Sequence, residues 1–543
     1  MYAELHAHSN FSLLDGADHP ETLARQAAAL GMPALALTDH DNVYGAVRFA
    51  QAARECGIRP VLGAELTLAG GHHLTLLVEN ADGWHNLCYL ISAARRDRPK
   101  GQAELPPDEL VGCTGGLIAL SGCRRGAIAT ALLQGRRAQA VTAARRYREL
   151  FGPDHFWIEL QRHWLPHEAY LLPRLRGLAG YLGIPCVATN NAHYARPARH
   201  TLQDVLVCIR HQVALDAAAH LLRGNSEFYL KPAAEMAALF PDDPEAVANS
   251  VRIAERCDFE LRYGLQDLPH FPTPGGMSDV AYLRRLCEQG LGARYPGAEA
   301  QARPQLNHEL AVIQRAGLAN YFLIVADIVR FARAQGIRCQ GRGSAANSLV
   351  AYLLHISPID PLAHALVFER FLSDERQAAP DIDLDFESER REEVIQYLYA
   401  TYGPAHVAMA CTFVTFRARS AVRDIGKALD LPPNVVAAAV HALDAQQPPA
   451  AVEEVERAPL QQLLQLCAQI EGYPRHLGIH SGGMVITAQP LMSRVPTEPA
   501  AMPGRSVVQW DKEGLEAAGL VKIDVLGLRM LSAVAEAVTL ITE

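Results

Sequence analysis

Residues 380–386, PDIDLDF, constrain the local fold more strongly than any other stretch of this chain. Aspartate alternates with an apolar residue, and a period of two is the pattern of a β-strand. Such a strand carries all its carboxylates on one face and its apolar side chains on the other. Because like charges on one face repel, the strand is stable only if cations lie between the carboxylates. The sequence therefore predicts a strand with one apolar face and one acidic, metal-binding face.

Two further motifs lie on either side of this strand. Residues 340–348, QGRGSAANS, predict a turn of small residues that opens an apolar helix, and such a turn offers backbone N–H groups to phosphate. Residues 520–526, LVKIDVL, predict a second strand with Lys522 and Asp524 on one face. A two-metal site for phosphoryl transfer needs a partner for the first acidic strand, and Asp524 is the candidate.

The first half of the chain alternates short apolar segments with amphipathic helices. Repeated strand–helix units of this kind favour a parallel sheet or barrel. We expect the helix at residues 42–57 to begin with an Asn42 cap. The predicted strands are residues 33–37, 60–64, 74–78, 116–120, 156–160 and 184–188.

Side chains that can bind metal follow several of these strands. In a β/α barrel the carboxyl ends of the strands meet at one rim, so these side chains are expected to converge. His6 and His8 project to one face of an extended N-terminal segment and can reach a single ion. Together these residues offer enough nitrogen, oxygen and sulfur ligands for two or three metal ions. The other candidates are Asp15, His40, Glu65, His72 or His73, Cys123, Asn191 and His193.

Length and composition set broad limits. A chain of 543 residues is expected to form more than one domain. Its 11 cysteines include no CxxC pair, which indicates a reducing compartment. There is no long apolar stretch or signal-peptide pattern, so we expect a cytoplasmic protein without membrane spans. The formal charge of −9 does not indicate nucleic-acid binding, although net charge averages over domains.

The motifs of the first half, LHAHS (5–9), TDH (38–40), GAE (63–65) and NAHY (191–194), resemble those of PHP domains. The resemblance implies a distorted β/α barrel with a multinuclear site for Zn²⁺ or Mn²⁺. Where the family has an acidic ligand before its last histidine, this chain has Asn191, whose neutral amide is a poorer ligand. The implied ligands are His6, His8, Asp15, His40, Glu65, His73, Cys123 and His193.

In the second half, GRGSAANS, PDIDLDF, HSGGMVI (480–486) and VKIDVLGLR (521–529) occur in this order. They resemble the catalytic palm of bacterial C-family DNA polymerases, the DNA polymerase III alpha subunit family. The resemblance implies two Mg²⁺ ions on Asp381, Asp383 and Asp524. It further implies that Arg342, Gly343 and Ser344 hold a nucleoside triphosphate and that Lys522 contacts phosphate or primer. Arg417, Arg419, Arg423 and Lys427 would face the DNA backbone.

On this resemblance the fold class is α/β, with a PHP-type distorted β/α barrel followed by a polymerase beta-like palm and a helical thumb insertion. We expect a PHP domain at 1–250, palm at 251–412 and 480–543, and thumb at 413–479. Residues 95–101, 202–206 and 480–483 are more similar to the error-prone, damage-tolerant branch than to the replicative one.

The resemblance implies a DNA-directed DNA polymerase that uses primer–template DNA and dNTPs. Family members continue into fingers and a clamp-binding segment, so a sliding clamp and accessory mutagenesis proteins are expected partners outside this chain. Two alternatives stay open. One is a metal-dependent phosphoesterase or 3′–5′ exonuclease in the first half, and the other is a non-catalytic module of a polymerase.

Overall fold

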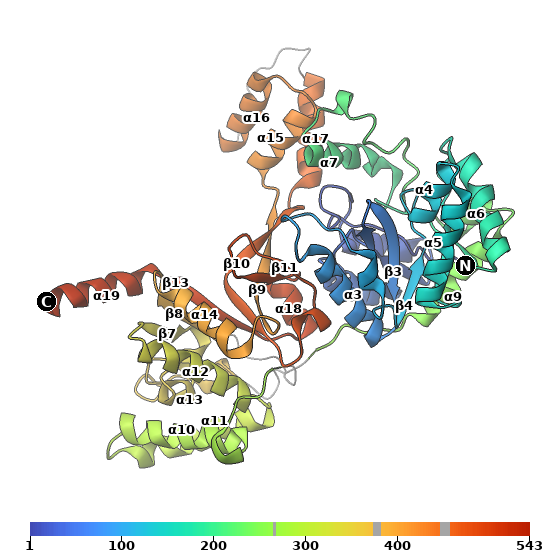
Figure 1. The fold of residues 1–543 in the computed structure, drawn as a ribbon. Coiled ribbons are helices and arrows are strands. Elements are labelled where there is room, and N and C mark those ends of the chain that lie inside the picture. Colours follow the sequence, from blue (N-terminus) through green and yellow to red (C-terminus); the bar gives the residue numbers. More distant parts are fainter. Residues whose placement is uncertain (264–267, 373–381, 446–456, 543) are drawn as a thin grey trace. The chain divides into compact units, whose positions relative to one another are not determined.

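The computed structural model describes the chain except residues 264–267, 373–381, 446–456 and 543 (Figure 1). The chain divides into two compact units. The first unit comprises Met1–Leu261 and Phe413–Gly478, and the second comprises Arg262–Thr412 and Ile479–Glu543.

The first unit contains a six-stranded sheet in the order β1-β2-β3-β4-β5-β6. All six strands predicted in this half of the chain are confirmed. Their bounds are β1 Ala34–Leu37, β2 Arg59–Leu68, β3 His72–Val78, β4 Leu117–Leu120, β5 Phe156–Leu160 and β6 Cys186–Ala188.

The expected parallel order fails at β3, which runs antiparallel to both β2 and β4, while the other neighbours are parallel. The reason is the short connection between β2 and β3. Gly70 and Gly71 adopt φ values of 82° and 74° there, and such a tight turn returns the chain antiparallel.

An extended N-terminal segment pairs with the chain on both of its sides. The amide of Ala36 in β1 donates to the carbonyl of Glu4 at 2.8 Å. On the other side, Ala192 N–H donates to His6 O and His8 N–H donates to Ala192 O, both at 2.8 Å. The segment therefore lies between β1 and the residues that follow β6, which places His6 and His8 inside the unit.

Helices complete the first unit as a mixed α/β fold. α2 begins at Ala46 after Gly45, so the expected Asn42 cap is wrong. The Asn42 amide instead donates to the carbonyls of Phe11 and His40 and holds the loop after β1. The helices are α1 Pro20–Ala29, α2 Ala46–Glu55, α3 Ala81–Arg95, α4 Ala127–Leu133, α5 Arg137–Phe151, α6 Glu168–Leu182, α7 His200–His211, α8 Ala233–Leu239 and α9 Pro244–Arg256.

Three later helices belong to the same unit: α15 Ala418–Ala428, α16 Pro433–Ala445 and α17 Arg457–Ile470. They share one apolar core with α7, in which Leu202 and Leu206 of α7 lie with Ile425 of α15 and Leu463 of α17. The Tyr473 hydroxyl donates to the Ala17 carbonyl at 2.8 Å and ties this helical segment to the N-terminal one.

The second unit contains a seven-stranded sheet in the order β11-β12-β9-β10-β13-β8-β7. Strands were predicted at residues 380–386 and 520–526, and β8 and β13 occur there within the described residues. Ile382, Leu384 and Phe386 are fully buried, as the alternating pattern predicts. The bounds are β7 Cys339–Arg342, β8 Asp383–Glu387, β9 Val407–Thr415, β10 Pro474–Ile486, β11 Thr497–Pro499, β12 Ser506–Val508 and β13 Lys522–Leu528.

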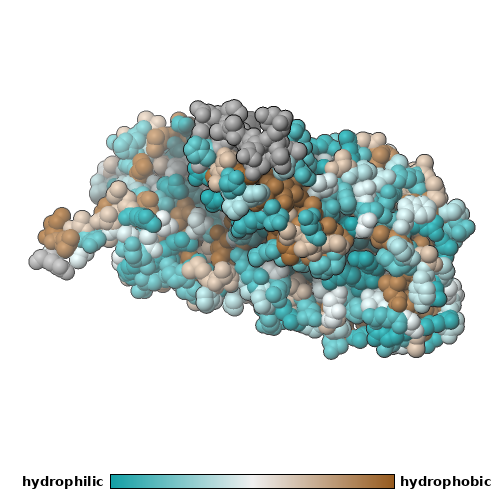
Figure 2. Space-filling model, turned by 90° about the horizontal axis from the view of Figure 1, so that it is seen from above, coloured by the Kyte–Doolittle hydropathy of each residue, from teal (hydrophilic) through white to brown (hydrophobic). Residues whose placement is uncertain are grey.

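The helices of this unit are α10 Asp279–Arg294, α11 Glu299–Arg315, α12 Ala319–Ala334, α13 Leu349–Leu353, α14 Arg391–Tyr402, α18 Lys512–Ala518 and α19 Arg529–Thr542. Within the described ranges no single helix is long and apolar enough to cross a membrane. Together, α11 and α12 have the length and apolar composition of a membrane span, but the chain bends by 114° between them. On the face seen in Figure 2, apolar side chains are interspersed among hydrophilic ones.

Candidate metal centres

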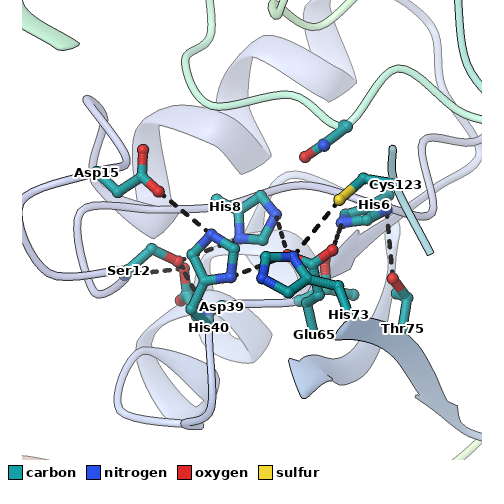
Figure 3. Close-up of polar contacts among 12 residues, drawn as sticks. His6, His8, Ser12, Asp15, Asp39, His40, Glu65, His73, Thr75 and Cys123 are labelled. Carbon is teal, nitrogen blue, oxygen red and sulfur yellow. Dashed lines mark hydrogen bonds and ion pairs between the residues drawn. The ribbon is translucent and has the colours of Figure 1, made fainter. Parts of the chain in front are cut away.

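Four histidines surround the Glu65 carboxylate in the first unit (Figure 3). Glu65 lies in β2 and is 1% exposed. One of its oxygens, Oε2, is 2.9 Å from Nδ1 of His40, which follows β1, and 2.9 Å from Nδ1 of His73 in β3. Nε2 of His6 lies 3.4 Å from Oε1, and Nε2 of His8 lies 3.8 Å from Oε2. The structure thus brings together five of the eight predicted ligands, namely the Glu65 carboxylate and the four histidines around it.

The remaining three predicted ligands lie at the margins of this Glu65 cluster. Cys123 Sγ is 3.4 Å from Nδ1 of His73. The His193 ring lies 4.3 Å from the His8 ring, centre to centre. Asp15 Oδ2 is 3.2 Å from Nε2 of His40.

Glu159 in β5 contacts the Glu65 cluster and was not among the residues predicted from the sequence. Its carboxylate lies 2.7 Å from Nδ1 of His6, so it orients that ring and leaves Nε2 facing Glu65. The available signal was a glutamate inside the otherwise apolar strand FWIEL.

The donor atoms of the cluster fit a bound metal. Buried imidazole nitrogens and carboxylate oxygens are costly when they lack partners. Among the described residues, buried atoms without a hydrogen bond include Nε2 of His6, His8 and His193, and both Glu65 carboxylate oxygens, whose contacts with the rings are ion pairs. Ligand atoms lie within 4.8 Å of one another in three overlapping groups: His6, His8 and Glu65; His40, Glu65 and His73; and His8, His40 and His193. This is a His/Glu metal-binding cluster, with ligand types that suit transition metals.

Charge is distributed unevenly over the histidines. Burial alone would lower the pKa of His6, but the Glu159 and Glu65 carboxylates raise it to about 10. Burial would also lower the pKa of His40, but the Glu65 and Asp15 carboxylates raise it to about 9. For His8, burial and the neighbouring His40 and His193 hold the pKa well below its usual value. Without a metal, two charged rings therefore flank the Glu65 anion.

A cavity of about 190 Å³ opens beside the cluster. Its walls combine the acidic and imidazole ligands with basic side chains that the sequence analysis did not assign. The basic residues are Arg124, Arg125, Arg210 and Arg223.

The second unit holds a pair of aspartates on adjacent strands. β8 and β13 are parallel, and Asp383 is the register partner of Asp524, so both carboxylates project from one face. Asp524 is 4% exposed, and its Oδ1 is buried without a hydrogen bond in the described part of the chain. Carboxylates placed in this way can share a hard cation. Asp381 lies outside the described residues.

Basic side chains accompany this aspartate pair. Arg342 Nη2 lies 3.6 Å from Asp383 Oδ2, and Arg342 Nε donates to Asp385 at 3.1 Å. Lys522 Nζ donates to Asp524. The structure therefore brings Arg342, Asp383, Lys522 and Asp524 to adjoining positions of three neighbouring strands.

The small-residue turn differs from its prediction in one respect. Gly343 has φ 70° and begins a 3-10 turn, Gly343–Asn347, directly after β7. The helix that follows does not offer its first N–H groups to phosphate, because the buried Glu309 carboxylate accepts from Leu349 and Val350 at 2.8 and 3.0 Å. A phosphate site here would depend on the turn, which contains Gly343 and Ser344.

The predicted basic row lies on α15 and just before it, in the first unit. Arg419, Arg423 and Lys427 are exposed and spaced four residues apart, so they share one helix face. Arg417 precedes the helix and is also exposed. Val422 and Ile425 are buried on the opposite side.

Comparison with known proteins relates both halves to characterised families. The model for the bacterial DNA polymerase III alpha NTPase domain matches residues 281–527, and the PHP domain model matches residues 4–163. A protein of Symbiobacterium thermophilum named error-prone DNA polymerase is 44% identical over 99% of this chain and 52% of its own length. The protein of that name from Mycobacterium tuberculosis is 44% identical over 100% of this chain and 50% of its own length.

The chain thus spans about half the length of the curated relatives it matches. A solved amidohydrolase structure from Chromobacterium violaceum aligns with 36% of this chain and 88% of its own, at 17% identity and a TM-score of 0.24, too low to indicate a shared fold.

Proposed function

Because the chain belongs to the bacterial DNA polymerase III alpha family and carries its PHP domain, we propose that it forms the catalytic palm of an error-prone DNA polymerase. The observation that carries this proposal is the alignment of Asp383 with Asp524 on adjacent parallel strands. Both residues lie inside the region matched by the polymerase model. The proposed domains are PHP at 1–250, palm at 251–412 and 480–543, and thumb at 413–479.

In the proposed palm, Asp383, Asp524 and Asp381 would hold two Mg²⁺ ions. Bound Mg²⁺ would supply activation of the primer 3′-hydroxyl and neutralisation of charge at the transferred phosphoryl group. The unbonded, buried Oδ1 of Asp524 supports this assignment. Asp385 is a positioning residue, because it is 3% exposed and accepts a hydrogen bond from Arg342.

The basic residues have separate proposed roles. Arg342, Gly343 and Ser344 bind the incoming triphosphate, and Lys522 contacts phosphate or primer. Arg417 and Arg423 bind the duplex backbone through charge, which gives affinity without sequence preference. A sliding clamp and accessory mutagenesis proteins would contact parts of the polymerase outside this chain.

Primer extension tests the palm assignment. The chain is assayed with Mg²⁺ and dNTPs together with a polypeptide that supplies the second half of a relative. Asp383→Asn and Asp524→Asn should each abolish extension while leaving the fold intact by circular dichroism. Asp430→Asn is the matched control, since Asp430 is exposed and has φ 52°, which asparagine also tolerates. Extension that survives both palm substitutions would contradict the assignment.

A second function, metal-dependent phosphoesterase or 3′–5′ exonuclease activity, is favoured by the cavity beside the Glu65 cluster. His6, His8, His40, Glu65 and His73 would hold Zn²⁺ or Mn²⁺ there. Hydrolysis of a single-stranded oligonucleotide with Mn²⁺ should be lost in His8→Asn and kept in His85→Asn, a histidine on the exposed side of α3. If the wild-type protein shows neither primer extension nor hydrolysis, the remaining hypothesis is a non-catalytic module of a polymerase.

A further inference from the structure

Asp15 lies at the edge of the metal cavity, but its carboxylate is already bound by protein side chains. Its Oδ1 accepts hydrogen bonds from Arg223 Nη2 and Gln203 Nε2, both at 3.1 Å. Its Oδ2 lies 3.6 Å from Arg210 Nη1. In the described part of the chain, the three groups of candidate ligand atoms are formed by histidines and Glu65, and none includes Asp15. Asp15 thus belongs to an ion-pair network beside the cluster.

Arg223 is held as a fixed cation in this network. Its side chain is only 19% exposed, and its guanidinium carbon lies 5.1 Å from the centre of the Phe228 ring. Phe228 is itself buried and stacks on His163 with ring centres 3.9 Å apart. Because arginine does not lose its proton in proteins, this side of the cavity carries a permanent positive charge.

Two residues that line the same cavity as Asp15 and Arg223, His193 and Asn191, carry no negative charge. His193 donates from Nδ1 to the Asn191 carbonyl at 2.8 Å, so Nε2 points inward, 4.0 Å from Asp15 Oδ2. Asn191, where the PHP resemblance implies an acid, contributes only a neutral amide. Its Oδ1 is buried and, within the described ranges, makes no hydrogen bond.

The Asp15–His193 side of the cavity is more positive than the PHP resemblance implies. Relative to an aspartate at position 191, the amide removes one negative charge, and the guanidinium adds one positive charge beside Asp15. A divalent cation between Asp15 and His193 would add two positive charges beside the guanidiniums of Arg223 and Arg210, which already pair with the Asp15 carboxylate.

We propose that Arg223 takes the place of a metal ion on the Asp15–His193 side of the cavity. Metal ions then bind only on the Glu65 side, and Asp15 serves as the counterion of Arg223. This inference depends on the proposal that the Glu65 cluster binds metal.

Metal counting tests the inference. Wild type and variants are loaded with Mn²⁺ or Zn²⁺, desalted, and analysed for ions per chain by mass spectrometry of the elements. Asp15→Asn should keep the wild-type count, whereas Glu65→Gln should lose at least one ion. The double variant R223Q/N191D should gain one ion over wild type. Arg124→Gln, on an exposed arginine of the same cavity, is the matched control and should change nothing.

Thermal unfolding in EDTA gives a second readout without metal. Asp15→Asn should lower Tm because Arg223 loses its partner, and adding R223Q should restore part of that loss. Loss of an ion in Asp15→Asn, or no gain in R223Q/N191D, would overturn the inference about Arg223. A wild-type protein that binds no metal would instead overturn the metal assignment of the Glu65 cluster, on which the inference depends.

Discussion

Glu65→Gln in metal-free protein is the most direct test of the charge arrangement in the first unit. The substitution keeps the shape of the side chain and removes one buried negative charge. Two histidines depend on that charge, because Glu65 lies 2.9 Å from His40 and 3.4 Å from His6, and both rings have raised pKa values. We therefore expect the variant to be destabilised most where these rings are charged.

The magnitude follows from the pKa of His40, which rises from 6.5 to about 9 in the folded protein. Burial opposes the rise, and Glu65 followed by Asp15 produces it. At about 1.4 kcal/mol per pKa unit, the rise corresponds to about 3 kcal/mol, and Glu65, as the larger of the two causes, contributes most of it. A raised histidine pKa stabilises the fold fully below pH 6.5, and that stabilisation is lost as the pH rises through 9.

Urea unfolding with EDTA at pH 6.5 and pH 9, followed by circular dichroism, measures this effect. Glu65→Gln should lower the unfolding free energy by about 2 kcal/mol at pH 6.5 and by less at pH 9. Glu104→Gln is the control, because Glu104 pairs with Arg98 at the surface and should change stability by less than about 1 kcal/mol. A Glu65→Gln effect no larger than the control, or one that grows with pH, would refute the reasoning.

Three further predictions concern metal, DNA and the turn region. Metal binding at pH 7 should release about two protons, from His6 and His40, measured by calorimetry in buffers of different ionisation enthalpy; release of none would contradict their charged state. Arg423→Gln and Lys427→Gln should each reduce the slope of log affinity for duplex DNA against log salt by about 0.9, and unchanged slopes would exclude α15 from the DNA contact. Glu309→Gln should lower the urea midpoint by the equivalent of about 1–3 kcal/mol, because two buried N–H donors of α13 lose a charged acceptor; an unchanged midpoint would argue against that role.

Local sequence patterns were sufficient to predict the strands of the first unit and most residues of the Glu65 cluster. Apolar segments of four or five residues predicted β1, β4 and β5, and the histidine spacing at His6 and His8 placed both rings on one side of an extended segment. These features depend on the alternation of neighbouring residues, which can be seen in the sequence itself. The antiparallel β3 was also within reach, since the Gly70-Gly71 pair is a hairpin signal.

Long-range partners were not predictable in the same way. Arg223 contacts Asp15 across 208 positions of sequence, and Arg342 contacts Asp385 across 43. The sequence around each arginine does not predict its partner, because ion pairing between distant segments depends on the topology of the fold and not on local spacing. Glu309 is similar, for its carboxylate caps a helix that begins 40 residues later.

The two centres balance their charges by different means, and this difference bears on how much each would gain from a bound cation. In the second unit, Arg342 and Lys522 pair with Asp383 and Asp524, so the acidic face carries its own counterions. In the first unit, the ion pairs that the described residues make with the Glu65 carboxylate come from imidazoles, whose charge is lost at high pH. Neutral imidazoles cannot neutralise a buried carboxylate, whereas arginine and lysine can. At high pH the Glu65 cluster would therefore gain more from a bound cation than the aspartate pair, which keeps its arginine and lysine counterions.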